Sequence, residues 1–148
     1  MGAHAAGELA SEISSTIIPL TYSKLLDQPP PTALEKAIKD ANFQINSRGT
    51  ANPDFHGMGT TTSALLLLPQ GAVVAQVGDS RVYRIRNGAI EQLSFDHSLS
   101  WELERRAKAN AEAYKNVPKN IITRSLGPSP NVEVDLEGPF PVEPGMSF

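Results

Sequence analysis

Hydrophobic residues recur with the period of a helix in the first part of the chain. Ala5, Leu9, Ile13 and Ile17 are spaced by four residues and form one apolar stripe. Pro19 is expected to end or kink this helix, because proline lacks the backbone N–H that a helix interior uses. The pattern therefore predicts an amphipathic helix that covers one side of a core.

A second apolar stripe follows the stiff proline run at 29–31. Its members are Leu34, Ile38, Ala41 and Ile45. Residues 32–35 have the capping-box pattern, in which a Thr hydroxyl and a Glu carboxylate each satisfy a free backbone N–H. We therefore predict a second amphipathic helix that starts at this box and ends near 47–49.

Between residues 58 and 95 the pattern changes to that of strands. The apolar run 64–68 is too short for a free-standing helix, and it predicts a strand covered on both faces. Further strands are expected over 71–77, 82–86 and 89–93. Asn87 and Gly88 both accept positive φ, so they predict a two-residue hairpin between the last two. The zone is thus predicted to be a run of four antiparallel strands.

The last zone mixes both patterns. Residues from Leu99 to about Tyr114 are charge-rich with few apolar positions, which predicts a helix on the surface. Apolar and polar residues alternate over 132–136, as in a half-exposed strand. A turn near Pro144 is followed by residues 146–148, Met-Ser-Phe, which are expected to begin another strand.

Composition removes several classes of protein. The 148 residues carry a formal net charge of -3 and include no cysteine. A disulfide scaffold, a thiol nucleophile and a zinc–thiolate site are therefore excluded. The mild acidity argues against a nucleic-acid partner. No targeting or membrane segment is evident, since the longest apolar run is far below the roughly 20 residues of a membrane span. A cytoplasmic location is expected.

Few residues suggest chemistry on pattern alone. The three histidines, His4, His56 and His97, lack the spacing of metal ligands, so each is interpreted as structural or exposed. Two short motifs, at 58–61 and 78–81, lie where strands begin or end. Each is interpreted first as turn chemistry, with Asp79 hydrogen-bonding the turn and Arg81 pairing with a carboxylate.

The order of the short motifs is more informative than any one of them. The stretch 1–8 (MGAHAAGE) heads the first helix, and G-T-T, V-G-D-S-R, D-H-S and T-R-S-L-G follow at 59–61, 77–81, 96–98 and 123–127. In this order they resemble the bacterial metal-dependent protein phosphatase family, the PPM or type 2C class. Its members carry D-G-M-G-G-H-x-x-G-E, G-T-T, V-G-D-S-R, D-H-S and T-R-x-L-G. The resemblance covers essentially the whole chain.

The resemblance implies an α+β fold, a four-layer α-β-β-α sandwich that is incomplete in this chain. It makes 1–148 the central part of a single catalytic domain. It also implies a protein serine/threonine phosphatase that hydrolyses phosphoserine and phosphothreonine through metal-activated water. The cofactor would be Mn²⁺ or Mg²⁺, and the substrate a phosphoprotein, the target of a serine/threonine kinase. The family's main metal carboxylates fall outside the matching residues, so we expect a fragment, truncated at both ends and inactive alone.

Three residues can be carried over from the family, and one of them, Gly2, belongs to the loop whose backbone passes the metals. Asp79 matches the V-G-D-S-R aspartate, which the resemblance assigns to a third, weaker metal site; the alternative is a turn-capping role. His4 matches the histidine beside the metal loop and would act as an acid toward the leaving group. Its alternative is a position behind the metal ligands. Ala3 departs from the family's second glycine, where the backbone approaches the ligands closely.

The resemblance also assigns residues 98–121 to the mobile flap beside the family's active site. The cations Arg105, Arg106 and Lys108 would there guide phosphopeptides, or else form a solvated helix face. Two other functions stay open. One is a non-catalytic pseudophosphatase or regulatory binding domain of the same fold, which Ala3 favours. The other is a small structural α+β domain whose motif order is coincidental.

Overall fold

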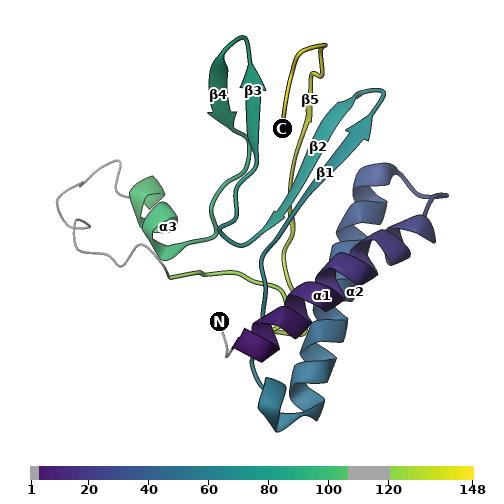
Figure 1. Cartoon of the computed structure of the whole chain (residues 1–148), viewed down its shortest axis with the longest axis vertical. Coiled ribbons are helices and arrows are strands. Elements are labelled where there is room, and N and C mark those ends of the chain that lie inside the picture. The colour runs from purple at the N-terminus through teal and green to yellow at the C-terminus, as the bar shows by residue number, and fades with distance from the viewer. Residues whose placement is uncertain (1–3, 107–120) are drawn as a thin grey trace.

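The computed structural model describes residues 4–106 and 121–148 of the chain (Figure 1). These form a mixed α+β structure. The helices are α1 (His4–Ser23), α2 (Pro30–Ala51), the single-turn η1 (Pro53–Phe55) and α3 (Leu99–Arg106). The strands are β1 (Thr62–Leu68), β2 (Gly71–Val77), β3 (Tyr83–Arg86), β4 (Ala89–Gln92) and β5 (Asp135–Phe140).

Both predicted N-terminal helices are confirmed, but their ends differ from the prediction. Helix α1 continues four residues past Pro19 and is therefore not ended by it. Helix α2 begins at Pro30 and has no side-chain cap, so the prediction that a capping box at 32–35 starts this helix was wrong. Proline suits the first helical position because its missing N–H would have no intrahelical partner there. The helix also runs on to Ala51, past the predicted end at 47–49.

The core lies between this helix pair and one face of a sheet. Helices α1 and α2 lie side by side, as Figure 1 shows. Ile13, Ile38 and Ile45 from the predicted stripes are buried there. The partly buried Ala64 and Leu66 of β1 and Leu136 of β5 pack against them. The helical periodicity therefore identified the buried face of α2, whose stripe is buried throughout. In α1 it was only partly right, because Ala5 is exposed and the buried face includes Ala6 and Ala10 instead.

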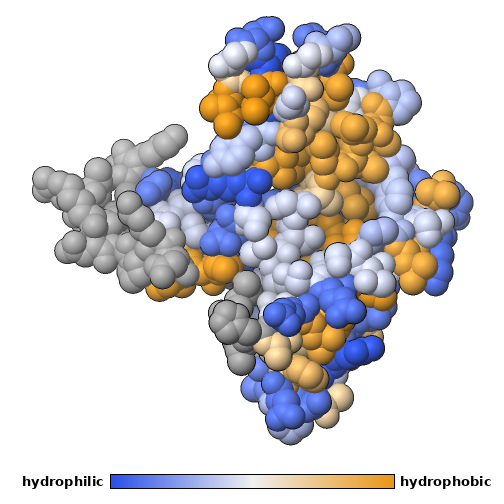
Figure 2. Space-filling model, in the orientation of Figure 1, coloured by the Kyte–Doolittle hydropathy of each residue, from blue (hydrophilic) through white to orange (hydrophobic). Residues whose placement is uncertain are grey.

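The sheet that the helices cover has three strands in the order β1-β2-β5, all antiparallel to their neighbours. The prediction that 64–68 is covered on both faces was wrong. Exposure alternates along β1, with Leu65 39% and Leu67 64% exposed. An unbroken leucine run hides this alternation, because both faces carry the same residue type. Hydrophobic residues are visible over the strands in Figure 2.

The predicted hairpin is confirmed, whereas the four-stranded run is not. Asn87 and Gly88 both have positive φ, 52° and 75°, and join β3 to β4. These two strands form a sheet of their own and do not pair with β2. The chain leaves the first sheet at Gly78, whose φ is 110°. The polar groups of the turn after β2 bond to side chains and loops, and so do not continue a ladder.

The C-terminal elements are shifted from their predicted positions. Strand β5 starts at Asp135, so the predicted strand 132–136 shares only two residues with it. Residues 146–148 form no strand; Ser147 makes a single antiparallel bridge to Ile85, with N–O distances of 2.8 and 3.0 Å. Helix α3 confirms the start of the predicted surface helix. Its continuation to Tyr114, and most of the predicted flap, lie outside the described residues.

None of the helices among the residues that the structure covers is long and apolar enough to cross a membrane.

Candidate active site

The turn that follows β2 is held by two partners at its first residue, Gly78. The Gly78 N–H donates to Nδ1 of His97 at 2.9 Å. In return, the His97 backbone N–H donates to the Gly78 carbonyl, also at 2.9 Å. The Gln76 amide donates to the same carbonyl at 3.1 Å and to the Ser80 carbonyl. Two of the sequence motifs, V-G-D-S-R and D-H-S, therefore meet at one point.

The segments around Thr60 and Arg124 join the same region. Thr60 and Leu126 exchange backbone hydrogen bonds of 3.0 and 2.9 Å. The Thr61 hydroxyl lies 2.7 Å from the Ser80 hydroxyl. His97 accepts the Thr123 N–H at its carbonyl, at 2.9 Å. All four motifs between residues 59 and 127 are thus brought together, although they are up to 68 positions apart in the chain.

The buried His97 is the centre of a side-chain network. Nδ1 accepts a hydrogen bond and is therefore unprotonated, so the ring proton is on Nε2. Nε2 donates to Oδ2 of Asp135 at 2.6 Å, and Arg124 donates to Oδ1 of the same carboxylate at 3.0 Å. Partial burial alone would raise the pKa of Asp135, but the hydrogen bonds from His97 and Arg124 outweigh it and lower that pKa.

Asp79 differs from its neighbours in the turn. It lines a cavity of 330 Å³ together with Arg81, Asp96, Ser98, Ser100, Trp101 and Glu104. Its carboxylate hydrogen-bonds to no residue within 4–106 or 121–148, whereas Gly78 and Ser80 on either side are both held. The turn is therefore maintained by Gln76, His97 and Thr61, and the turn-capping interpretation of Asp79 finds no hydrogen bond among the described residues.

Arg81 and Asp96 form an ion pair at this cavity. Arg81 Nε lies 3.0 and 3.1 Å from the two Asp96 oxygens, and Nη2 lies 2.6 Å from Oδ2. The hydrogen bonds to Asp96, then the one to Tyr83, raise the pKa of the Arg81 guanidinium. The predicted pairing of Arg81 with a carboxylate is confirmed. Asp96 is thereby engaged, which leaves Asp79 and Glu104 as the other carboxylates at the cavity.

The oxygen-rich donor set around Asp79 suits a hard divalent cation such as Mg²⁺ or Mn²⁺ in its chemistry. The number of oxygen ligands is too small, however, because such ions take about six. Over the described parts of the chain, no group of three or more acidic or histidine side chains is placed to hold a metal ion. Asp79 therefore fits the role of one ligand among several that come from water or from other residues.

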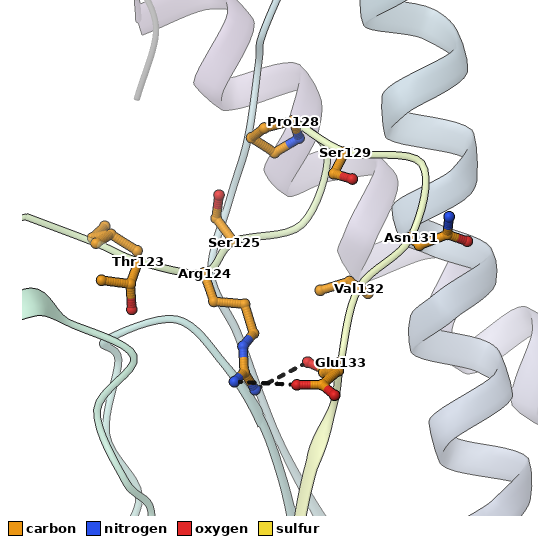
Figure 3. Close-up of a pocket in the computed structure, with 9 residues that line it drawn as sticks. Thr123, Arg124, Ser125, Pro128, Ser129, Asn131, Val132 and Glu133 are labelled. Carbon is orange, nitrogen blue, oxygen red and sulfur yellow. Dashed lines mark hydrogen bonds and ion pairs between the residues drawn. The ribbon is translucent and has the colours of Figure 1, made fainter. Parts of the chain in front are cut away.

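A second pocket, of 390 Å³, is lined by Arg124 (Figure 3). The arginine reaches across it toward Glu133, with Nη1 3.3 Å from the Glu133 carbonyl and Nη2 3.6 Å from its carboxylate. Ser125, Ser129 and Asn131 also line it. Arg124 thus both lines this pocket and hydrogen-bonds to Asp135.

The two residues assigned from the sequence have different outcomes. Asp79 stands at the cavity, on the turn predicted for it. His4 is the first residue of α1, and the structure describes only its backbone, so its role as an acid stays a prediction. Sequence reasoning missed Asp135, which carries no motif. It interpreted His97 as a structural or exposed histidine, and the structure shows the buried, hydrogen-bonded form.

The fold and the site together define an α+β protein with a carboxylate presented on the wall of a cavity at a strand-end turn. Comparison with known proteins identifies the family. The protein phosphatase 2C family model matches residues 1–127. The chain belongs to the protein phosphatase 2C family, as the motif order predicted.

Individual relatives agree with this assignment. The serine/threonine phosphatase Stp of Listeria welshimeri is 39% identical over 140 residues, which are 91% of this chain and 56% of that protein. The PPM Ser-Thr phosphatase MsPP of Mycobacterium smegmatis, solved with cacodylate, superimposes with a TM-score of 0.80 at 29% identity; the match covers 98% of this chain and 62% of that one. The PstP catalytic domain, solved with two manganese ions, gives 0.70 at 27% identity, covering 93% and 58%. The chain thus spans about 60% of the length of these relatives.

Proposed function

We propose that this chain is part of a metal-dependent protein serine/threonine phosphatase whose substrates are phosphoproteins made by a serine/threonine kinase. Family membership supports the reaction class. The observation that carries the proposal further is the state of Asp79. Its turn is fixed by other groups, while its own carboxylate, on the wall of the cavity, hydrogen-bonds to no described residue.

Mn²⁺ or Mg²⁺ is the proposed cofactor, and Asp79 would be one of its ligands. A bound divalent ion supplies Lewis-acid stabilisation of a phosphoryl group and lowers the pKa of water. Asp79 would hold its oxygens toward the ion, and Ser98 and Ser100 add hydroxyl groups to the same wall. Arg81 would keep the charge of Asp96 neutralised, so that Asp96 does not compete with Asp79 for the ion. His4 is proposed as the acid that protonates the leaving oxygen.

The wider architecture belongs to the same proposal. Residues 1–148 would be the central part of one catalytic domain with a four-layer α-β-β-α arrangement, and residues 98–121 its flap. The chain by itself would not hydrolyse phosphoesters. The cytoplasmic location and the absence of a nucleic-acid partner stay predictions from the sequence.

A manganese titration followed by NMR tests the metal role. The chain has a single tryptophan, and Trp101 lines the cavity with Asp79. We expect paramagnetic Mn²⁺ to broaden the Trp101 indole N–H signal, and Mg²⁺ in excess to reverse the effect. Asp79→Asn should remove the broadening, whereas Asp54→Asn, on the exposed η1 turn, should not. Equal broadening in Asp79→Asn would overturn the assignment of Asp79.

The catalytic part of the proposal requires the longer protein. The coding DNA on either side of these 148 codons shows whether further carboxylates are encoded, and the complete reading frame is then expressed. We expect Mn²⁺-dependent phosphate release from a phosphothreonine peptide, weakened by Asp79→Ala. A protein that binds the phosphopeptide without hydrolysing it, with and without added Mn²⁺, would instead be the pseudophosphatase that the sequence left open.

A further inference from the structure

We propose that His97 is a positioning residue for Asp79, and that it acts through the backbone of Gly78. The inference rests on the proposed role of Asp79 as a metal ligand. It assigns the buried histidine a task that is neither acid–base catalysis nor metal binding. Instead, one ring nitrogen fixes the peptide that precedes the ligand, and the other fixes the ring itself.

The first step is the double contact with Gly78. His97 binds both polar backbone atoms of that residue, with Nδ1 on its N–H and the backbone N–H on its carbonyl, each at 2.9 Å. The Gly78 carbonyl belongs to the peptide group that leads into Asp79. Once this peptide plane is fixed, the direction of the Asp79 side chain depends only on the φ of Asp79 and on its rotamers.

The second step is the conformation of Gly78. Its φ of 110° is one that residues with a side chain rarely adopt. Glycine pays for this freedom with a large entropy loss on folding, so an isolated glycine turn would sample many conformations. The two hydrogen bonds from His97 oppose that sampling. They explain how a flexible residue can precede a carboxylate that has to point in one direction.

The third step is that the imidazole has no freedom of its own. It is 5% exposed, and Nε2 donates to Asp135 at 2.6 Å. Arg124 holds the other Asp135 oxygen at 3.0 Å, and Thr123 donates to the His97 carbonyl. Both ring nitrogens are therefore engaged with groups of the protein itself. The network links β5 and the T-R-S-L-G segment to the turn that carries Asp79.

Two substitutions separate the tasks of the two nitrogens. In His97→Asn the amide oxygen can occupy the place of Nδ1 and still accept the Gly78 N–H, but the group is too short to reach Asp135. In His97→Gln the amide nitrogen can reach toward Asp135 in place of Nε2, but no acceptor remains beside Gly78. The variants therefore form a matched pair, and Asn is the conservative replacement for the proposed function.

The test repeats the manganese titration with the Trp101 indole signal on both variants. We expect His97→Asn to keep the apparent Mn²⁺ affinity within about twofold, and His97→Gln to lose about tenfold, the effect of removing a group that orients a metal ligand. The Gly78 amide should exchange with solvent faster in His97→Gln than in His97→Asn. Equal affinities in the two variants, whether both retained or both lost, would overturn the inference.

Two further results keep the inference apart from the proposed function. If Asp79→Asn abolishes the response and His97→Gln does not, the metal role stands and the positioning role is wrong. If Asp79→Asn has no effect, both fall. Should either variant fail to fold, ¹⁵N NMR of the unmodified His97 ring decides: an unprotonated Nδ1 and a protonated Nε2 support the inference, and the opposite tautomer overturns it.

Discussion

Arg81 and Asp96 are paired through three short contacts, but the two side chains differ in burial. The Asp96 side chain is 8% exposed, whereas that of Arg81 is 46% exposed. Gln92 adds one further hydrogen bond to the carboxylate, at 3.0 Å. The pair therefore joins an almost buried anion to a cation that water can reach. Removing Arg81 and removing the charge of Asp96 should therefore reduce the stability of the chain by different amounts.

Arg81→Ala should destabilise the chain more than Asp96→Asn. Without Arg81 a nearly buried carboxylate keeps, among the residues that the structure describes, only the hydrogen bond from Gln92, and such an under-satisfied group costs about 2 kcal/mol. Without the Asp96 charge, the guanidinium can turn to water, and a half-exposed pair is worth little because solvent screens it. Urea unfolding measures both variants. The double variant Arg81→Ala/Asp96→Asn should regain part of the stability, and simple additivity of the two losses would contradict this explanation.

Gly78→Ala should be among the most damaging single changes in the chain. A Cβ at Gly78 would come within 2.4 Å of the Thr61 side chain, and the φ of 110° is itself unfavourable. We expect a loss above about 3 kcal/mol, from backbone strain and overpacking together. Gly88→Ala is the matched control, since its φ is also positive but nothing lies within 4 Å. It should cost about 1 kcal/mol, and a similar loss at both glycines would rule out the Thr61 contact as the cause.

Part of the fold followed directly from local sequence. The stripes of α1 and α2 and the Asn87-Gly88 hairpin depend on spacing and on the φ preferences of single residues, which a sequence displays. The exposure of one face of β1 and the separation of β3 from β2 depend on partners far along the chain. Leu65 and Leu67 look like core residues until the sheet order is known. No local pattern reports that order.

The candidate site was predictable to a similar extent. Motif order identified Asp79 and the region around it. It did not reveal Asp135, because a lone acidic residue in an alternating segment resembles the solvent side of a strand. The network of His97, Asp135 and Arg124 exists only because β5 pairs with β2 and places Asp135 opposite Gln76. That register depends on the tertiary structure, and the local sequence of neither strand determines it.

Asp135 should contribute stability that disappears in acid. Its pKa in the folded chain lies below the ordinary value of 3.8, because hydrogen bonds from His97 and Arg124 outweigh the opposing effect of burial. A lowered folded pKa stabilises the folded state above the unfolded pKa, and this contribution is lost as pH falls through the folded value. The difference in unfolding free energy between the unmodified chain and Asp135→Asn should therefore be constant well above pH 3.8. It should begin to shrink at about pH 5, as the unfolded carboxyl starts to protonate, and continue to shrink at lower pH. Urea unfolding at several pH values measures it, and a difference unchanged in acid would contradict the sign.

The 148-residue chain alone should show no Mn²⁺-dependent hydrolysis of p-nitrophenyl phosphate. An ion held mainly by Asp79 would take most of its ligands from water, and would be neither tightly bound nor placed against a substrate. The assay compares the pure chain with and without Mn²⁺, alongside an intact relative as positive control. Turnover that copurifies with the chain and is lost in Asp79→Ala would contradict the prediction.

Asp79→Ala should leave the stability of the chain almost unchanged, which distinguishes a ligand from a turn cap. The carboxylate accepts no hydrogen bond from a described residue, while the turn is held through Gly78, Ser80 and the side chain of Gln76. A partly exposed side chain with no such partner is expected to alter the unfolding free energy by less than about 0.5 kcal/mol. Gln76→Ala is the contrasting variant, because its amide is buried and bonded to two turn carbonyls; it should cost about 2 kcal/mol. If instead Asp79→Ala destabilises the chain as much as Gln76→Ala does, Asp79 is a turn cap. Its position at the cavity would then be explained by its role in the turn and would not support a role as a metal ligand.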